Sequence, residues 1–318
     1  TFPVTSGKIF IDGDDVTAEP EFKRAKYIGR VFQDTRMGTA SDMSIEQNLA
    51  IAYRRGKKRT LRWGITERER GLYRELLSQL DLGLEHRLKD KTRFLSGGQR
   101  QALTLLMASF HQPKLLLLDE PFAALDSYLK WKMEQQMMDL LKDIQKPALF
   151  VSHSRDEVYR LCDTVSCINQ GKMEVIEPVK EFFKNPKTKT AALLSGCKNI
   201  CSVELVKDLE PDKSFGKLWA AEWGVAFNVS KEAFTARTVG IRAHYMMQKK
   251  PKAGHITELT VGEYRILEDP FEWNISFRKD ENCEWLQWKI SKSDWNPSVG
   301  VPKVLYVREE DLLLLDKE

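Results

Sequence analysis

The sequence predicts an α/β domain followed by a small all-β domain, and three patterns support this. Residues 115–118 are four leucines followed by Asp119 and Glu120, as in a buried central parallel strand that ends in carboxylates. A serine and two glycines at 96–98 precede an apolar run, which predicts a helix over 99–109. Beyond about residue 200, short alternating segments rich in Trp and Tyr predict a small β-barrel.

The composition is that of a globular protein of about two domains. The 318 residues include 50 basic and 46 acidic ones, a net charge of +4, which gives no reason to expect a nucleic-acid partner. No stretch reaches the ~20 apolar residues of a membrane helix, and the first residues do not resemble a signal peptide. Five scattered cysteines predict reduced thiols in the cytosol and no metal-binding pattern.

The first third of the chain predicts two strands and then a helical region. Residues 7–11 form a strand pattern that runs into the turn pair Asp12-Gly13, and residues 27–33 form a second one that ends at Gln33. Residues from about 35 to 94 are expected to be helical. Ser44 and Gln47 make a capping box there, and leucines at 72, 76, 77 and 80 predict an amphipathic helix.

A basic cluster at 54–59 interrupts this region. A solvated loop is its ordinary interpretation. The alternative is contact with anionic lipid headgroups, at about 1 kcal/mol per basic residue near the surface.

The second part of the α/β pattern ends in a histidine. Residues 127–145 predict a helix whose Met133 and Met137 pack in the core, and residues 148–151 predict a strand that leads into Ser152 and His153. In open α/β sheets, ligands gather beyond the carboxyl ends of the strands. Asp119 and Glu120 are therefore candidate site residues, whereas a single histidine such as His153 is by itself more often a satisfied polar residue.

The order of these motifs closely resembles the ATPase subunit of ABC transporters. The motifs are Leu-Ser-Gly-Gly-Gln at 95–99, Asp-Glu-Pro at 119–121, Ala-Leu-Asp at 124–126 and Val-Ser-His at 151–153. The resemblance implies a P-loop-NTPase-like core with a helical subdomain over about 35–110, and it implies ATP and Mg²⁺ as cofactors. In that family two subunits sandwich two ATP molecules.

The resemblance also implies a role for each site residue. Asp119 holds Mg²⁺ through water, Gln33 reaches the metal and the attacking water, and Glu120 polarises that water. His153 positions the water and contacts the γ-phosphate. The signature residues Ser96, Gly97, Gly98 and Gln99 face the nucleotide of the other subunit, and Asp126 lies in the loop that crosses the dimer interface.

The P-loop pattern Gly-x-x-x-x-Gly-Lys-[Ser/Thr] does not occur in these 318 residues. Ser6-Gly7-Lys8 is the nearest match, but it lacks the first glycine and leads into a strand. Residues 7–13 instead resemble the family segment that follows the P-loop and its helix. We therefore expect an N-terminally truncated piece of a longer protein, which by itself neither binds nor hydrolyses ATP well.

The C-terminal part resembles an accessory domain. Residues 178–187 are similar to the end of an ABC ATPase domain, and Gly240 to His244 are similar to an element of the TOBE-type β-domain. The predicted domains are thus 1–195 and 196–318. Strands are expected within 217–229, 238–246, 255–267, 271–278, 285–290 and 303–307.

The family implies a transmembrane permease, an ATPase dimer partner and a periplasmic or lipid-anchored substrate-binding protein, with this subunit at the cytoplasmic face of the membrane. Residues 120–318 resemble ATPases of molybdate or sulfate import, whereas residues 1–118 look more like those of amino-acid uptake. The chain is therefore interpreted as a natural recombinant or an artificial join near 110–120.

We expect an oxyanion importer, with an amino-acid importer as the alternative. A non-enzymatic oxyanion-binding module is the alternative from another class. Soluble ABC proteins of repair or translation usually carry two cassettes, whereas a single signature occurs here.

Overall fold

The computed structural model describes residues 4–55, 64–110, 113–123, 125–144, 147–206 and 215–315. The chain divides into two compact units, Thr1–Cys162 and Asp163–Glu318, named here the α/β unit and the β-rich unit. The predicted domain boundary at residue 195 remains a prediction. Residues 163–195 pack within the β-rich unit, where the buried Arg242 donates hydrogen bonds to the carbonyl oxygens of Ser195 and Phe183.

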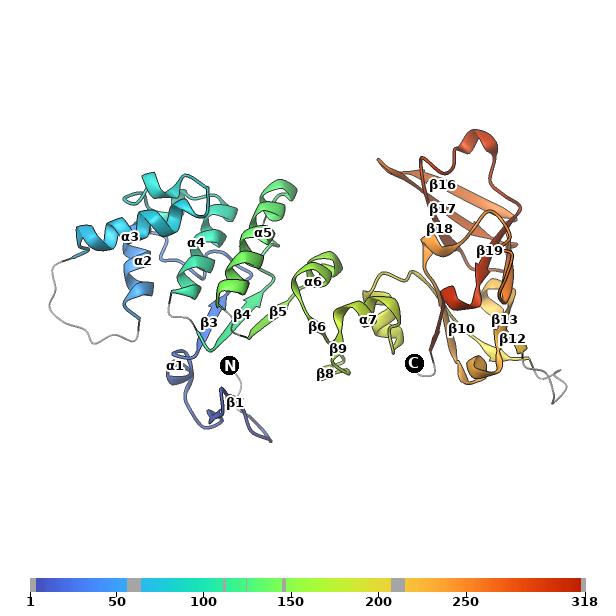
Figure 1. Cartoon of the computed structure of the whole chain (residues 1–318), viewed down its shortest axis with the longest axis horizontal. Coiled ribbons are helices and arrows are strands. Elements are labelled where there is room, and N and C mark those ends of the chain that lie inside the picture. The colour runs from blue at the N-terminus through green and yellow to red at the C-terminus, as the bar shows by residue number, and fades with distance from the viewer. Residues whose placement is uncertain are drawn as a thin grey trace. The chain divides into compact units, whose positions relative to one another are not determined.

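The α/β unit is built on a three-stranded parallel sheet in the order β3-β4-β5 (Figure 1). The strands are β3 (Ile28–Val31), β4 (Leu115–Asp119) and β5 (Ala148–Val151). Leu116 and Leu118 of β4 are buried in one core with residues of α4 (Gly97–Ser109) and α5 (Ser127–Ile144). The predicted α/β class and the central strand are confirmed.

The N-terminal hairpin is shorter than predicted but turns at the expected residues. β1 (Phe10–Ile11) pairs with β2 (Asp14–Asp15), and the connecting Asp12 and Gly13 both have positive φ, 55° and 85°. Two positive φ values are what a two-residue type I′ turn requires. The short helix α1 (Glu21–Arg24) follows.

The expectation of helix throughout 35–94 is wrong in extent. The structure has α2 (Ile45–Tyr53), α3 (Glu67–Ser78) and two 3₁₀ turns, η1 (Leu84–His86) and η2 (Thr92–Phe94). Asp81 and Gly83 have φ values of 49° and 69°, which interrupt a right-handed helix after α3. The capping box of Ser44 and Gln47 is confirmed, whereas positions 56–59 of the basic cluster lie outside the described residues.

The helix α5 packs as predicted, with Met133 and Met137 buried in the core. The last helix of this unit, α6 (Arg155–Leu161), is fixed to α5 by two ion pairs. The Arg160 guanidinium donates to both carboxylate oxygens of the buried Glu134, and Lys130 pairs with the buried Glu157. No helix among the described residues has the length and apolar character needed to cross a membrane.

The β-rich unit begins with four two-residue strands and two short helices and continues as a set of longer strands. The first group is β6 (Thr164–Val165), β7 (Ile168–Asn169), β8 (Lys172–Met173), β9 (Glu177–Pro178), α7 (Val179–Lys184) and α8 (Lys189–Leu194). The second group is β10 (Asn199–Ser202), β11 (Glu204–Leu205), β12 (Phe215–Ala220), β13 (Val225–Ser230), β14 (Thr238–Ile241), β15 (Ile256–Thr260), β16 (Glu263–Glu268), β17 (Glu272–Arg278), β18 (Leu286–Ser291), β19 (Val304–Arg308) and β20 (Leu312–Leu315).

Within the described residues, the longer strands pair as four small antiparallel sheets, β10-β14-β20, β11-β12-β13, β15-β19 and β16-β17-β18. One core that includes Trp223, Trp288 and Trp295 joins them. All six predicted segments contain strands. The predicted segments do not include β20, although its four leucines repeat the pattern of residues 115–118.

Candidate functional site

The acidic end of β4 carries the first feature of the site. Asp119 is the last residue of the strand, and Glu120 follows with a φ of 43°. A non-glycine residue in this region is uncommon and costs conformational energy, which is tolerated where the surroundings fix it. The backbone N–H of Glu120 donates to the carbonyl oxygen of Val151 at 2.9 Å, so the neighbouring strand holds this turn.

The Glu120 carboxylate is shared by two predicted site residues. The Gln33 side chain donates from Nε2 to Glu120 Oε2 at 2.8 Å, and His153 Nε2 lies 2.8 Å from Glu120 Oε1. The Glu120 side chain is 17% exposed and that of His153 is 89% exposed. The three residues follow β3, β4 and β5, whose carboxyl ends meet at one edge because the strands are parallel. The structure therefore brings all three predicted catalytic residues together.

Asp119 has a cationic neighbour that the sequence analysis missed. Arg30 Nη2 lies 3.7 Å from Asp119 Oδ2, and the Arg30 guanidinium lies 4.4 Å from the centre of the Phe32 ring. In the register, Arg30 pairs with Leu117, two residues before Asp119, so both side chains lie on the same face of the sheet. Strand alternation was the signal that could have placed Arg30 beside Asp119.

The signature residues form a capped helix start. Ser96 Oγ accepts a hydrogen bond from the Gln99 N–H, and Gln99 Oε1 accepts one from the Ser96 N–H, both at 3.2 Å. Gly97 is exposed at the tip, whereas Gly98 is buried. A Cβ at Gly98 would lie 1.9 Å from Leu129 Cδ2, so this glycine is needed for the close packing of α4 on α5.

Asp126 also occupies a helix start. Its Oδ1 accepts hydrogen bonds from the N–H groups of Tyr128 and Leu129 at 3.1 and 3.0 Å, which caps α5. The preceding Ala124 lies outside the described residues. Among the described residues, no hydrogen bond or ion pair joins this cap or the tip at 96–99 to Glu120. The predicted site residues therefore form two groups within this chain.

The residues at the acidic edge fit Mg²⁺ by their chemistry. The Asp119 carboxylate already attracts a cation, Arg30. Gln33 donates its N–H to Glu120, which leaves its amide oxygen as an acceptor. The described residues contain no group of three or more His, Cys, Asp or Glu able to hold a metal ion. Mg²⁺ commonly uses one or two carboxylates together with water and phosphate oxygens, and that mode suits Asp119 and Gln33.

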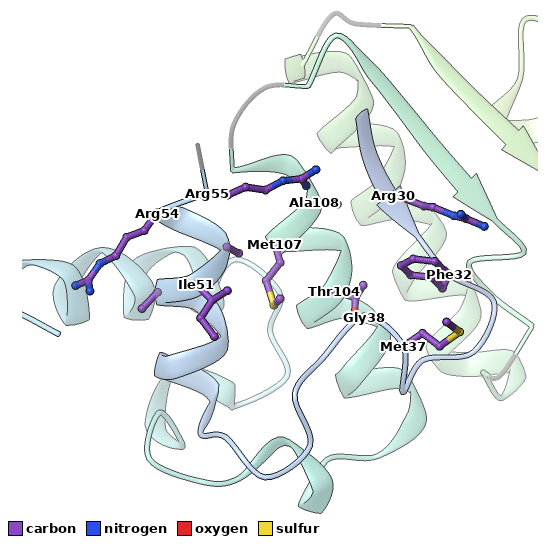
Figure 2. A pocket seen from close by; sticks show the side chains of 12 residues that line it. Arg30, Phe32, Met37, Gly38, Ile51, Arg54, Arg55, Thr104, Met107 and Ala108 are labelled. Atoms are coloured by element: carbon purple, nitrogen blue, oxygen red, sulfur yellow. The ribbon is translucent and has the colours of Figure 1, made fainter. Parts of the chain in front are cut away.

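A groove of about 640 Å³ lies between β3, α2 and α4 (Figure 2). Met37 and Ile51 line it and are 68% and 56% exposed. Arg54 on its rim is paired with Glu69, with Nη2 2.8 Å from Oε2. Arg55 donates to the carbonyl oxygens of Ala25 and Ile28, which are neutral partners. The groove thus combines exposed apolar side chains with a basic rim.

Comparisons with known proteins show the family to which the chain is similar. The family model described as ABC transporter matches residues 1–123. The chain is 34% identical over 184 residues to the tyrosine transport ATP-binding protein of Clostridioides difficile, covering 58% of this chain and 72% of that protein. It is also 34% identical over 195 residues to the molybdate/tungstate import ATP-binding protein WtpC of Thermococcus kodakarensis, covering 61% and 56%.

Other relatives carry other substrate names. The glycine betaine/carnitine/choline transport ATP-binding protein OpuCA of Bacillus subtilis is 32% identical over 182 residues, with 57% of this chain and 46% of that protein covered. The chain thus spans about half the length of OpuCA and WtpC. A solved dimeric structure of the ATP-binding cassette MJ0796 bound to ADP and Pi is 26% identical, with a TM-score of 0.47 and coverage of 55% of this chain and 74% of that one.

Proposed function

This chain belongs to the family of ABC transporter ATP-binding proteins, and from that premise we propose that the protein is the ATP-hydrolysing subunit of an importer. One observation carries the proposal. Gln33 Nε2 donates to one carboxylate oxygen of Glu120 at 2.8 Å, and His153 Nε2 lies 2.8 Å from the other, at the shared edge of three parallel strands. This edge is where open α/β sheets bind ligands.

The geometry suits the orientation of a water molecule for attack on a phosphoryl group. Partners on both oxygens fix the plane of the Glu120 carboxylate, which is then positioned to accept a hydrogen bond from that water. His153 is exposed and can turn toward a phosphate while it keeps contact with Glu120. Mg²⁺-bound ATP supplies the phosphoryl group and much of the charge neutralisation, and Asp119 with the Gln33 amide oxygen would hold the metal.

The second group of site residues serves a neighbouring subunit in this proposal. The helix tip at 96–98 presents the capping residue Ser96 and the exposed Gly97 at the N-terminus of the 13-residue α4. The N-terminus of a helix favours the binding of an anion. Over the part of the chain that the structure describes, no hydrogen bond or ion pair connects that tip to Glu120, in keeping with a site completed by a dimer partner. The partner contributes the phosphate-binding loop, and Asp126 lies beside the junction.

The groove of Figure 2 is the proposed docking surface for the permease. It lies on the predicted helical subdomain, and its exposed Met37 and Ile51 are suited to an apolar face of a partner helix. The basic rim would lie near the headgroups at the cytoplasmic face of the membrane. In this assembly a periplasmic or lipid-anchored binding protein delivers the substrate.

The substrate is proposed to be an oxyanion of the molybdate or sulfate type. The 34% identity to the molybdate/tungstate protein supports this, together with the resemblance of residues 120–318 to such ATPases and of the β-rich unit to a TOBE domain. The equal identity to the tyrosine transport protein supports an amino-acid substrate as the second candidate.

The experiment is transport by the chain co-purified with its permease from native membranes and reconstituted in vesicles. We expect ATP-dependent uptake of labelled molybdate, and its loss in His153→Ala. Uptake of tyrosine but not molybdate would overturn the oxyanion assignment and leave the ATPase role intact. If the chain recovers no permease, and calorimetry of the whole chain gives heat with molybdate, the protein is the binding module instead.

A further inference from the structure

Arg30 is the cationic neighbour of Asp119, the proposed metal ligand. Its guanidinium is 3.7 Å from the Asp119 carboxylate, with both side chains about two-fifths exposed, 42% and 37%. The guanidinium lies over the ring of Phe32, two residues further along the chain, at 4.4 Å from the ring centre. Figure 2 shows Arg30 and Phe32 side by side, with the Arg30 guanidinium directed away from Arg54 and Arg55. The contact therefore belongs to the acidic edge of the sheet.

A guanidinium and a metal ion compete for one carboxylate. Arginine stays charged at every pH at which the protein is folded, so the competition cannot be relieved by deprotonation. The pair is loose, because 3.7 Å is longer than a charge-assisted hydrogen bond and water reaches both groups. Such a pair neutralises the charge of Asp119, but a ligand that gives Arg30 another anion to bind can break it.

We propose that Arg30 is a positioning residue that keeps free divalent cations off Asp119 and admits the metal together with a nucleotide phosphate. The phosphates would give the released guanidinium a new anionic partner, so metal and nucleotide bind better together than the metal does alone. The inference rests on the proposed function, since it takes Asp119 to be the metal ligand. It explains why this edge carries a cation and an aromatic ring beneath it.

The test is Mn²⁺ binding to the whole chain without nucleotide, followed by electron paramagnetic resonance, with Mn²⁺ as the probe for Mg²⁺. We expect Arg30→Met to bind Mn²⁺ about 3- to 10-fold more tightly than the wild type, and Arg30→Lys to lie between them. Arg36→Met is the matched control, because it removes one positive charge from an exposed arginine in the loop that follows β3, and no ion pair with Asp119 is described for Arg36. It should change the affinity less than 2-fold.

The double variant Arg30→Met/Asp119→Asn separates the possible failures. If the double variant lacks the tighter Mn²⁺ binding of Arg30→Met, the result supports the proposal. If Asp119→Asn weakens Mn²⁺ binding but Arg30→Met leaves it unchanged, Arg30 is not a competitor and the metal assignment stands. If the double variant binds as tightly as Arg30→Met, Asp119 is not the ligand, and the inference fails together with the metal part of the proposed function. Circular dichroism verifies that each variant is folded.

Discussion

The interior of the β-rich unit and the acidic edge of the α/β unit use their polar side chains differently. In the β-rich unit, buried polar side chains bond to the backbone. Asn199 joins two sheets by donating to the carbonyl oxygens of Ile241 and Gln287. Arg242 donates to the carbonyl oxygens of Ser195 and Phe183. At the edge of the parallel sheet, side chains bond to side chains, as Gln33 and His153 do with Glu120.

This difference distinguishes polar side chains that stabilise the fold from those that are available to a ligand. A buried side chain that satisfies backbone groups cannot leave them without a penalty, because the backbone groups then stay unpaired. Partly exposed side chains that bond to one another can exchange those partners for a ligand at little cost. We therefore expect substitutions in the first set to lower stability, and substitutions in the second set to lower function and leave stability nearly unchanged.

The largest expected stability effect is that of Asn199→Ala. The side chain donates to Ile241 O and Gln287 O at 2.9 Å and accepts from Gln287 N–H at 2.6 Å, so one buried and two partly buried backbone groups lose their partner. We expect a loss of about 3 kcal/mol in the free energy of unfolding. Urea denaturation followed by tryptophan fluorescence measures it, since six of the eight tryptophans lie in the β-rich unit.

The exposed Asn282→Ala is the control for this change and should lie within about 0.5 kcal/mol of the wild type. Equal losses in the two variants would break the contrast between buried and exposed polar groups.

A pair of glycine substitutions tests the packing of the α/β unit at a smaller scale. A Cβ at Gly29 of β3 would lie 2.7 Å from the carbonyl oxygen of Ala108, so Gly29→Ala should destabilise the unit by about 1–3 kcal/mol. Gly71 lies inside α3 with open space around its Cα, so Gly71→Ala should stabilise it by about 0.5–1 kcal/mol. Opposite signs in urea denaturation followed by circular dichroism confirm the prediction, and a neutral Gly29→Ala contradicts it.

Alkaline pH should give the smallest effect, and it should arise in the β-rich unit. Burial raises the pKa of the Cys201 thiol to about 12 and that of Cys197 to about 11, from a value near 9. The folded state therefore keeps these protons when the unfolded state has lost them. The stabilisation is complete below pH 9 and is lost as the pH rises toward 11–12. The melting temperature should fall less steeply above pH 9 in Cys201→Ala than in the wild type, and parallel slopes would show that Cys201 does not contribute.

Local patterns allowed the sequence to predict part of this structure. The caps at Ser44 and Ser96 and the leucine strand at 115–118 depend on neighbours close in the chain, and the structure has all of them. The resemblance to ABC ATPases, and not a local pattern, singled out Gln33 and His153 beside Glu120, and the parallel strands bring all three to one edge of the sheet.

Features that depend on long-range packing were not predictable in this way. The role of Gly98 against Leu129 joins two helices whose packing no local pattern indicates. The ion pair of Arg30 and Asp119 could be placed by strand alternation only once the register of β3 and β4 was known. The extent of helix in 35–94 was overestimated, because Asp81 and Gly83 adopt a left-handed backbone, which ends a helix and for which Gly83 was the available signal.

The most direct test of the account is the rate of phosphate release by the permease complex carrying Glu120→Gln. The account predicts a rate at least about 100-fold below that of the wild type, with an unchanged urea midpoint of the isolated chain. Glu75→Gln, on the exposed side of α3, should change neither quantity. A Glu120→Gln complex that releases phosphate at the wild-type rate would contradict the assignment of Glu120 as the carboxylate that orients water.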